Sequence, residues 1–211
     1  MTQENFETIV HTADGFSKIL RKKLSNGHAN HPETLIASAA RMSGTLLFRS
    51  FSHNLDEHEP GVKIPSEQAD INTPKLVNLM LNSLKQLGHM IDKEALASAD
   101  VTTALARLSL LETQELLDPW YMALCEKSNL TLYQGALSAA TTVGLLIHEC
   151  RDSLIVDAGC AIAIYGFNEA ARTTPRRLAA SLRSDTRMEA TIDDTSRDKE
   201  DDNKKPWYQI W

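Results

Sequence analysis

Apolar residues recur at helical spacing along most of the chain. They form one stripe through residues 4–24, and residues 32–51 repeat the pattern. The predicted helices cover residues 4–24, 32–51, 74–87, a run from near 92 or 100 to 117, 119–127, 130–172 with a break near Asp152, and 175–182. No segment shows the period of two that is typical of a β-strand. The pattern predicts an all-α protein: a single globular domain of about seven or eight helices over residues 1–184, with an apolar hairpin at residues 130–172 as its core.

Proline marks four of the predicted helix starts. A helix tolerates proline at its first position because the missing N–H would have no partner there. The prolines in question are Pro32, Pro74, Pro119 and Pro175. Thr73, Asp118 and Thr174 precede three of them and are expected to supply N-cap oxygens.

One connection between predicted helices is long. It runs over residues 52–73 and contains Pro60, Gly61 and Pro65. Connections of this length inside a domain are uncommon, and they are either functional or partly disordered. A surface excursion without a specific role is the interpretation that we favour.

The helical pattern ends at Ser184. Residues 185–211 contain eight acidic and five basic residues without apolar periodicity, which predicts an acidic tail that is disordered on its own. The tail ends in a short aromatic peptide. Its expected partner-binding residues are Trp207, Tyr208, Ile210 and Trp211. The alternative is that this peptide folds back onto its own domain or onto a second copy of the chain.

Composition favours helices and limits the classes of function. The chain of 211 residues has 27 Leu and 23 Ala against 12 Ile and 6 Val. Its net charge of −6 argues against a surface that binds nucleic acid or anionic lipid throughout. A local basic patch consists of Arg172, Arg176, Arg177, Arg183 and Arg187. This patch would bind phosphate or nucleic acid unless the acidic tail screens it, and we favour screening.

Three cysteines, Cys125, Cys150 and Cys160, show no metal-finger spacing and no even disulfide set. They favour a reducing compartment. The first residues lack the basic start and the apolar run of a signal peptide. The apolar stretches 135–148 and 154–167 are each too short to cross a bilayer. We therefore expect a cytoplasmic protein without a membrane partner.

The best catalytic candidate is the sequence HECRD at residues 148–152. On a helix, His148 and Asp152 share a face and Glu149 lies beside them. Two ligands on one face with a neighbouring carboxylate are typical of metal hydrolases, and the segment resembles the zinc-peptidase HExxH pattern with Asp in place of the second His. The favoured alternative is a solvated turn that follows an apolar helix.

Histidines in the predicted loops form a second set. His28 and His31 lie close together, and His53 and His58 flank Asp56, with more acids beside them. Imidazoles and carboxylates on such segments are suited to a divalent cation, with His53 and His58 as the metal candidates. Ordinary surface histidines are the favoured interpretation.

Asp157 is the single charged residue of a long apolar stretch. A buried isolated carboxylate is costly, so we expect an arginine partner, Arg41 or Arg49. A structural ion pair is favoured over a catalytic acid.

Small residues recur four apart in the central hairpin. They are Ala136, Ala140, Gly144, Gly159, Ala163, Gly166 and Ala170. Such residues let helix backbones approach closely, either within one subunit or across an interface between copies. Packing within one subunit is slightly favoured, and self-association through the hairpin is the alternative hypothesis.

The favoured function is a non-enzymatic helical interaction or assembly protein that self-associates and docks through its aromatic C-terminal peptide. Its rival is a small metal-assisted hydrolase or ligand-binding protein built on the HECRD segment. Binding of phosphate or nucleic acid through the arginine patch comes third, and no motif identifies a cofactor.

Overall fold

The computed structural model describes residues 3–24, 31–51, 58–91, 96 and 106–177. Its helices are α1 (Gln3–Leu24), α2 (Pro32–Ser50), α3 (Glu67–Gln86), α5 (Leu110–Lys127), α6 (Leu132–Glu149) and α7 (Val156–Ala171). The described residues contain no strand, only one isolated β-bridge. The predicted all-α class is confirmed, with six helices in this part of the chain instead of seven or eight.

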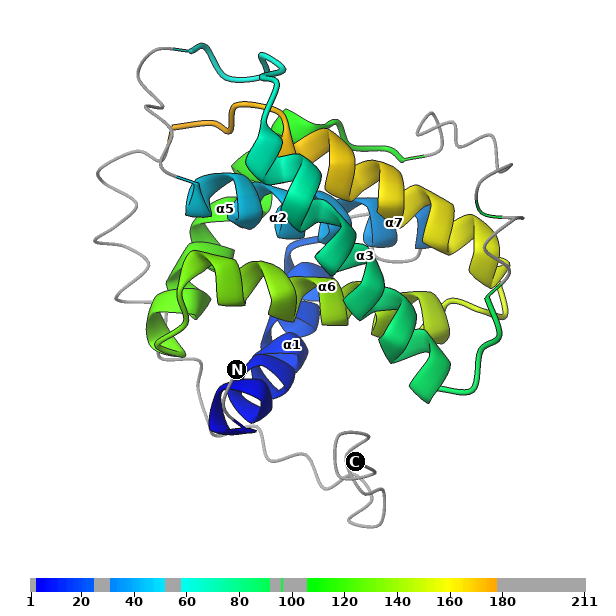
Figure 1. Ribbon diagram of the computed structural model, residues 1–211. Coiled ribbons are helices and arrows are strands. Elements are labelled where there is room, and N and C mark those ends of the chain that lie inside the picture. Colours follow the sequence, from blue (N-terminus) through cyan, green and yellow to red (C-terminus); the bar gives the residue numbers. More distant parts are fainter. Residues whose placement is uncertain (1–2, 25–30, 52–57, 92–95, 97–105, 178–211) are drawn as a thin grey trace.

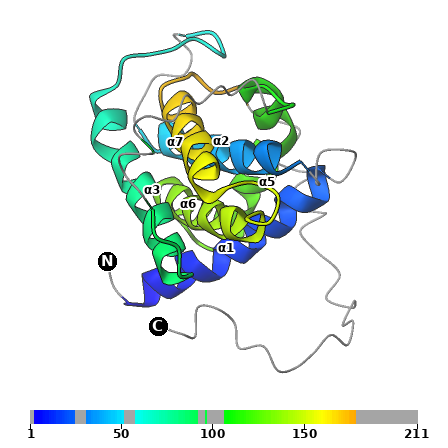
Figure 2. The same ribbon diagram turned by 90° about the vertical axis from the view of Figure 1, so that its right-hand side faces the viewer.

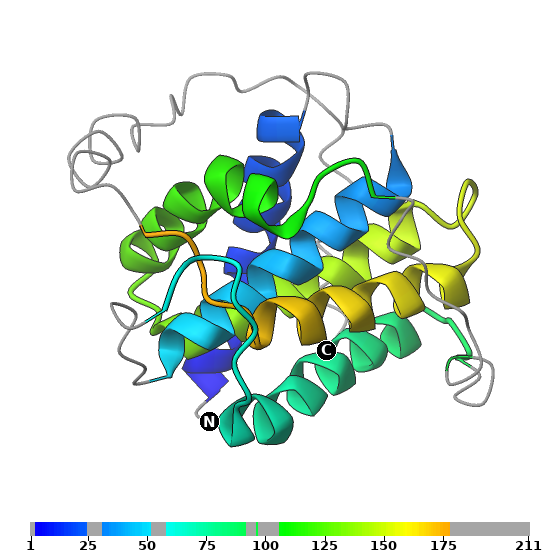
Figure 3. The ribbon, with the colours of Figure 1, turned by 90° about the horizontal axis from the view of Figure 1, so that it is seen from above.

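Helix α2 is the centre of the fold. Every residue from Thr34 to Phe48 is buried, so this helix has no solvent face. Its most extensive contacts are with α7 and α6, and Figure 3 shows α2 and α7 side by side. Helices α6 and α7 contact each other at few positions. The expected core hairpin is therefore wrong in detail, because each of its two helices packs mainly on α2.

Small residues allow α2 and α7 to touch at the backbone. A Cβ atom on Gly44 would lie 2.7 Å from the carbonyl oxygen of Phe167, and one on Gly166 would lie 2.9 Å from the Cβ of Ala40. Ile36 lies near Gly159 in the same way, so the two helices run in the same direction. The small residues expected to pack closely do so within one chain.

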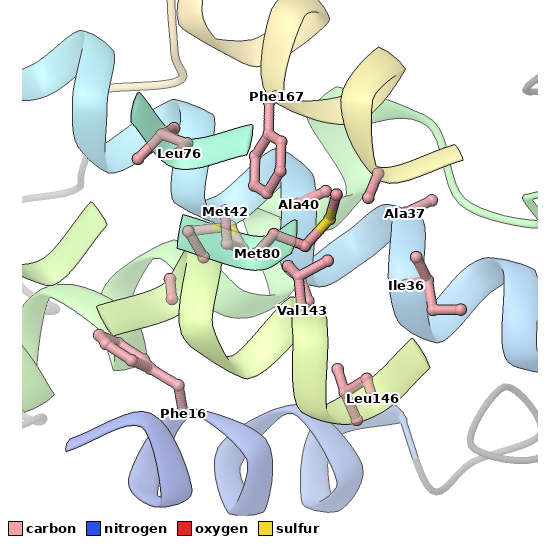
Figure 4. Close-up of a cluster of buried hydrophobic side chains, with 14 of the residues drawn as sticks. Phe16, Ile36, Ala37, Ala40, Met42, Leu76, Met80, Val143, Leu146 and Phe167 are labelled. Atoms are coloured by element: carbon pink, nitrogen blue, oxygen red, sulfur yellow. The ribbon is translucent and has the colours of Figure 1, made fainter. Parts of the chain in front are cut away.

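A single cluster of apolar side chains joins all the helices. Figure 4 shows Phe16 of α1, Leu76 and Met80 of α3, and Phe167 of α7 around the central helices. Helix α5 adds Tyr121, whose ring lies 4.4 Å from that of Phe16. Helix α1 crosses beneath α6 (Figures 1 and 2).

Two helices begin earlier than their prolines predict. Helix α3 begins after Ser66, whose side chain accepts a hydrogen bond from the Ala69 N–H, and Pro74 lies inside the helix. Helix α5 begins after Ser109 in a reciprocal capping box with Glu112, and Pro119 lies inside it. The predicted helix boundaries at residues 74 and 119 are wrong, because serine caps and buried upstream residues extend both helices through the proline.

The predicted long connection is also shorter than expected, because α3 begins at Glu67. Its described part, residues 58–66, pairs with the chain that follows α7. The Gly61 N–H donates to the Thr174 carbonyl at 2.9 Å, and the Ile64 N–H donates to the Arg172 carbonyl at 2.7 Å. Residues 172–177 are therefore not helical, against the predicted start at Pro175. The predicted tail, residues 185–211, lies outside the described residues.

Candidate functional site

The HECRD segment does not form the one-faced cluster that the metal-hydrolase alternative requires. Helix α6 ends at Glu149 with Cys150 as its C-cap, so Asp152 lies in the turn before α7. Glu149 forms an ion pair with Arg21 of α1. Asp152 is exposed, 4.0 Å from Arg151. The i, i+4 pairing of His148 with Asp152 is wrong because the helix ends between them.

His148 instead meets His89, a residue that sequence reasoning missed. The Nδ1 atom of His148 lies 2.8 Å from the Nε2 atom of His89, with the two rings edge to face. His89 directly follows Gly88, whose φ of +87° closes the C-terminal cap of α3. In that cap the His89 N–H donates to the Leu84 carbonyl at 3.0 Å. In the sequence, the glycine that follows the apolar pattern of α3 indicates a helix C-cap. Only the packing of α3 on α6 brings the two histidine rings together.

The hydrogen-bond partners of His148 indicate which of its ring nitrogens carries the proton. A guanidinium only donates, and Nη1 of Arg151 lies 3.2 Å from Nε2 of His148. Nε2 therefore accepts, and the proton of a neutral His148 sits on Nδ1, from which it donates to His89. The pKa of His148 is lowered by burial first, then by Arg151 and His89, while Glu149 and Asp152 act in the opposite direction.

An open pocket of about 380 Å³ lies beside His89 along α3. Its lining consists of Asn78, Leu81, Asn82, Lys85, His89, Met90 and Ile91. Met90 is almost completely exposed. The pocket gives water access to the His89 side of the histidine pair.

The two arginines expected near Asp157 have other partners. Nε of Arg41 lies 2.7 Å from Glu169 of α7, and Arg49 pairs with Asp118 of α5. The predicted partner of Asp157 is therefore wrong. Asp157 is half-buried in the first turn of α7, where free N–H groups of the helix stabilise a carboxylate.

Helix α5 carries a row of buried polar groups that sequence reasoning also missed. The row consists of Gln114, Asp118, Tyr121 and Cys125. Neither Oδ1 of Asp118 nor the Tyr121 hydroxyl has a hydrogen-bond partner among the described residues. Burial raises the pKa of Asp118 against the opposing effect of Arg49, and it also raises the pKa of Tyr121. The predicted N-cap role of Asp118 is wrong, because α5 begins after Ser109 and Asp118 lies inside the helix.

The chain that follows α7 is held by this buried row at Arg176. The Arg176 N–H donates to Oε1 of Gln114 at 3.1 Å, and Arg49 donates to the Arg176 carbonyl at 2.6 Å. The Arg176 side chain forms an ion pair with Glu115. We call this set of contacts the Arg176 clamp.

The arginine patch is partly engaged in ion pairs. Arg172 lies 2.6 Å from Asp70 and also contacts Asn168, and Arg176 contacts Glu115. Arg177 is exposed. Arg183 and Arg187 lie outside the described residues. A phosphate group at Arg172 or Arg176 would have to displace a carboxylate.

The other candidate residues stay apart in the described part of the chain. His31 caps α2 by accepting from the Thr34 N–H, and His58 is exposed. His28 and His53 lie outside the described residues, as do Trp207, Tyr208, Ile210 and Trp211. Among the described residues, no group of three or more His, Cys, Asp and Glu side chains is placed to hold a metal ion.

Comparison with protein-family models, with curated proteins and with solved structures gives no match. None of the described helices is by itself long and apolar enough to cross a membrane. Helices α5 and α6 meet that test only as a pair, and they are bent by 113° at their junction.

Proposed function

We propose that this chain is a non-enzymatic interaction protein whose helical body presents its C-terminal segment to a protein partner. The observation that supports the proposal is the Arg176 clamp, which holds the main chain close to the last of the described residues, just before the C-terminal segment in the sequence. The clamp rests on a buried ion pair between Arg49 and Asp118. Because Arg176 is held in place, the length of chain that follows it limits how far the aromatic peptide can extend.

The composition of the terminal segment suits such a role. Charged residues keep a linker extended, and aromatic anchors supply most of the binding energy in peptide recognition. Trp207, Tyr208, Ile210 and Trp211 are the proposed contact residues. A cytoplasmic location belongs to the same proposal.

Self-association is part of the proposal, but it needs another surface than the small-residue stripe. Gly44, Gly144 and Gly166 face neighbouring helices of the same chain. The C-terminal peptide is the remaining candidate, with a second copy of the chain as its partner. The hydrolase alternative is weakened because His148 and Asp152 do not share a helix face. The phosphate alternative is weakened because a phosphate group would compete with the carboxylates that pair with Arg172 and Arg176.

The test compares the full chain with the double variant Trp207→Ala, Trp211→Ala. The solution mass is measured by light scattering at micromolar concentration, and co-purifying proteins are quantified after affinity capture from the source cells. Two aromatic anchors of about 2 kcal/mol each amount to about 4 kcal/mol, which predicts a roughly 1,000-fold loss of affinity for the partner or second copy.

The matched control is Tyr165→Ala, which removes a partly exposed aromatic side chain from the body. This control should retain the mass and partner of the unaltered chain. Equal mass and equal recovery for the parent and the double variant would contradict the proposal.

A further inference from the structure

The ends of α3 and α6 bring two imidazole nitrogens to one point. We propose that His89, through Nε2, and His148, through Nδ1, bind a divalent transition-metal ion of the zinc, nickel and copper class. Neutral imidazole is a preferred ligand of these ions. The proposal concerns the end of the molecule around Gly88 and does not depend on the C-terminal peptide.

The separation of the two nitrogens is close to what a metal requires. Their distance of 2.8 Å is that of a hydrogen bond. Two nitrogens that each lie about 2.0–2.1 Å from a tetrahedral ion are about 3.4 Å apart. The two nitrogens therefore need to separate by roughly 0.6 Å, and both rings need to turn so that each lone pair points at the ion instead of at the other ring.

Both ligands are positioned before any ion arrives. His89 follows the closed cap of α3, in which its own N–H bonds to Leu84. His148 belongs to the last turn of α6 and is half-buried. Preorganised ligands reduce the conformational entropy that binding costs.

The position of the proton on the His148 ring makes Arg151 a competitor of the metal ion. Nδ1 of His148 carries a proton in the hydrogen-bonded pair and must lose it to bind a metal. The neutral ring then carries its proton on Nε2, so no net proton is released. A protonated Nε2 cannot accept from Arg151, so the present contact of 3.2 Å has to break. The Arg151 side chain is about half exposed, and its Nη1 also donates to the His148 carbonyl at 2.9 Å, a bond that it can keep or exchange for water when the contact with Nε2 breaks.

The surrounding charges partly offset each other. Arg151 and Lys85 oppose a cation on this end of the molecule, whereas Glu149 and Asp152 lie near enough to His148 to favour one. Glu149 is itself paired with Arg21. His89 lines an open pocket, so solvent lies close to the pair, and we expect water to fill the remaining coordination positions of an exchangeable site.

The test is isothermal titration calorimetry of the full chain with zinc chloride and nickel chloride. His89→Gln and His148→Gln should each weaken binding at least tenfold. His58→Gln and His11→Gln remove exposed histidines outside the pair and should leave binding unchanged. Cys150→Ser should also leave it unchanged, which shows that the adjacent thiol is not a ligand.

Arg151→Ala separates a metal site from a purely structural hydrogen bond. The proposal predicts severalfold tighter binding in this variant, because the competing contact and one positive charge are gone. Cupric ion should report nitrogen coupling by electron paramagnetic resonance that is lost in both histidine variants. Each variant is first checked by circular dichroism for an unchanged helix signal. Binding that persists in both histidine variants, or that weakens in Arg151→Ala, would overturn the proposal.

Discussion

The buried ion pair between Arg49 and Asp118 makes the sharpest prediction about stability. The side chain of Asp118 is 1% exposed and that of Arg49 is 7% exposed. Asp118→Ala removes the only carboxylate that the described structure places against this guanidinium. We expect the free energy of unfolding to fall by about 3–5 kcal/mol, because a buried charge is left without its partner.

This expected loss of unfolding free energy comes from the unpaired charge of Arg49 and not from the volume of the removed side chain. Alanine removes only the small carboxyl group, whereas Arg49 keeps, among the described residues, only its bond to the Arg176 carbonyl. The double variant Arg49→Met, Asp118→Leu replaces the pair by apolar side chains. It should recover to within about 1 kcal/mol of the parent or exceed it, since buried pairs rarely outperform apolar packing.

The assay is urea unfolding followed by circular dichroism, with the slope checked for a common denatured state. Asp70→Ala is the matched control, because Asp70 pairs with Arg172 at the surface and its side chain is 66% exposed. That variant should lose less than about 1 kcal/mol. A loss for Asp118→Ala no larger than that of the control, or a double variant as unstable as the single one, would show that the unpaired buried charge is not what lowers the stability.

Two further predictions test packing and burial. Gly44→Ala should lower the free energy of unfolding in urea by about 1–3 kcal/mol, because the added Cβ meets the backbone of α7. Gly15→Ala is the control: its added Cβ meets only the side chain of Leu124, so the variant should be close to neutral or stabilised. Equal losses in the two variants would contradict this account. Burial raises the pKa of both Cys125 and Cys160 to about 12 from 9.0. Their labelling by Ellman's reagent at pH 8 should be about 1,000-fold slower than that of an ordinary thiol until the chain unfolds, and rapid labelling of either in the native protein would refute their burial.

Local pattern alone determined a large part of the architecture. The apolar stripe of residues 4–24, the start at Pro32 and the break near Asp152 agree with α1, α2 and the turn between α6 and α7. These features are local: each depends on side-chain periodicity or on one missing N–H. The same local signals misplaced the starts of α3 and α5, because burial of upstream residues outweighs the loss of one hydrogen bond at a proline.

The candidate site depended much more on contacts between distant residues. The pattern pointed to His148, but its partner His89 lies 59 positions away. Asp118 looked like a helix cap and is instead the buried partner of Arg49. The apolar periodicity of a sequence does not distinguish a polar residue that caps a helix from one that forms a buried ion pair with another helix.

By itself, then, the sequence determined the helical class, most helix positions and the small residues available for close packing, because these follow from interactions within a few residues. The tertiary structure alone decided that α2, and not the pair of α6 and α7, lies at the centre. It also decided which arginine meets which carboxylate and which histidines meet. These outcomes depend on how whole helix faces fit together, and that fit is a property of the complete packed core.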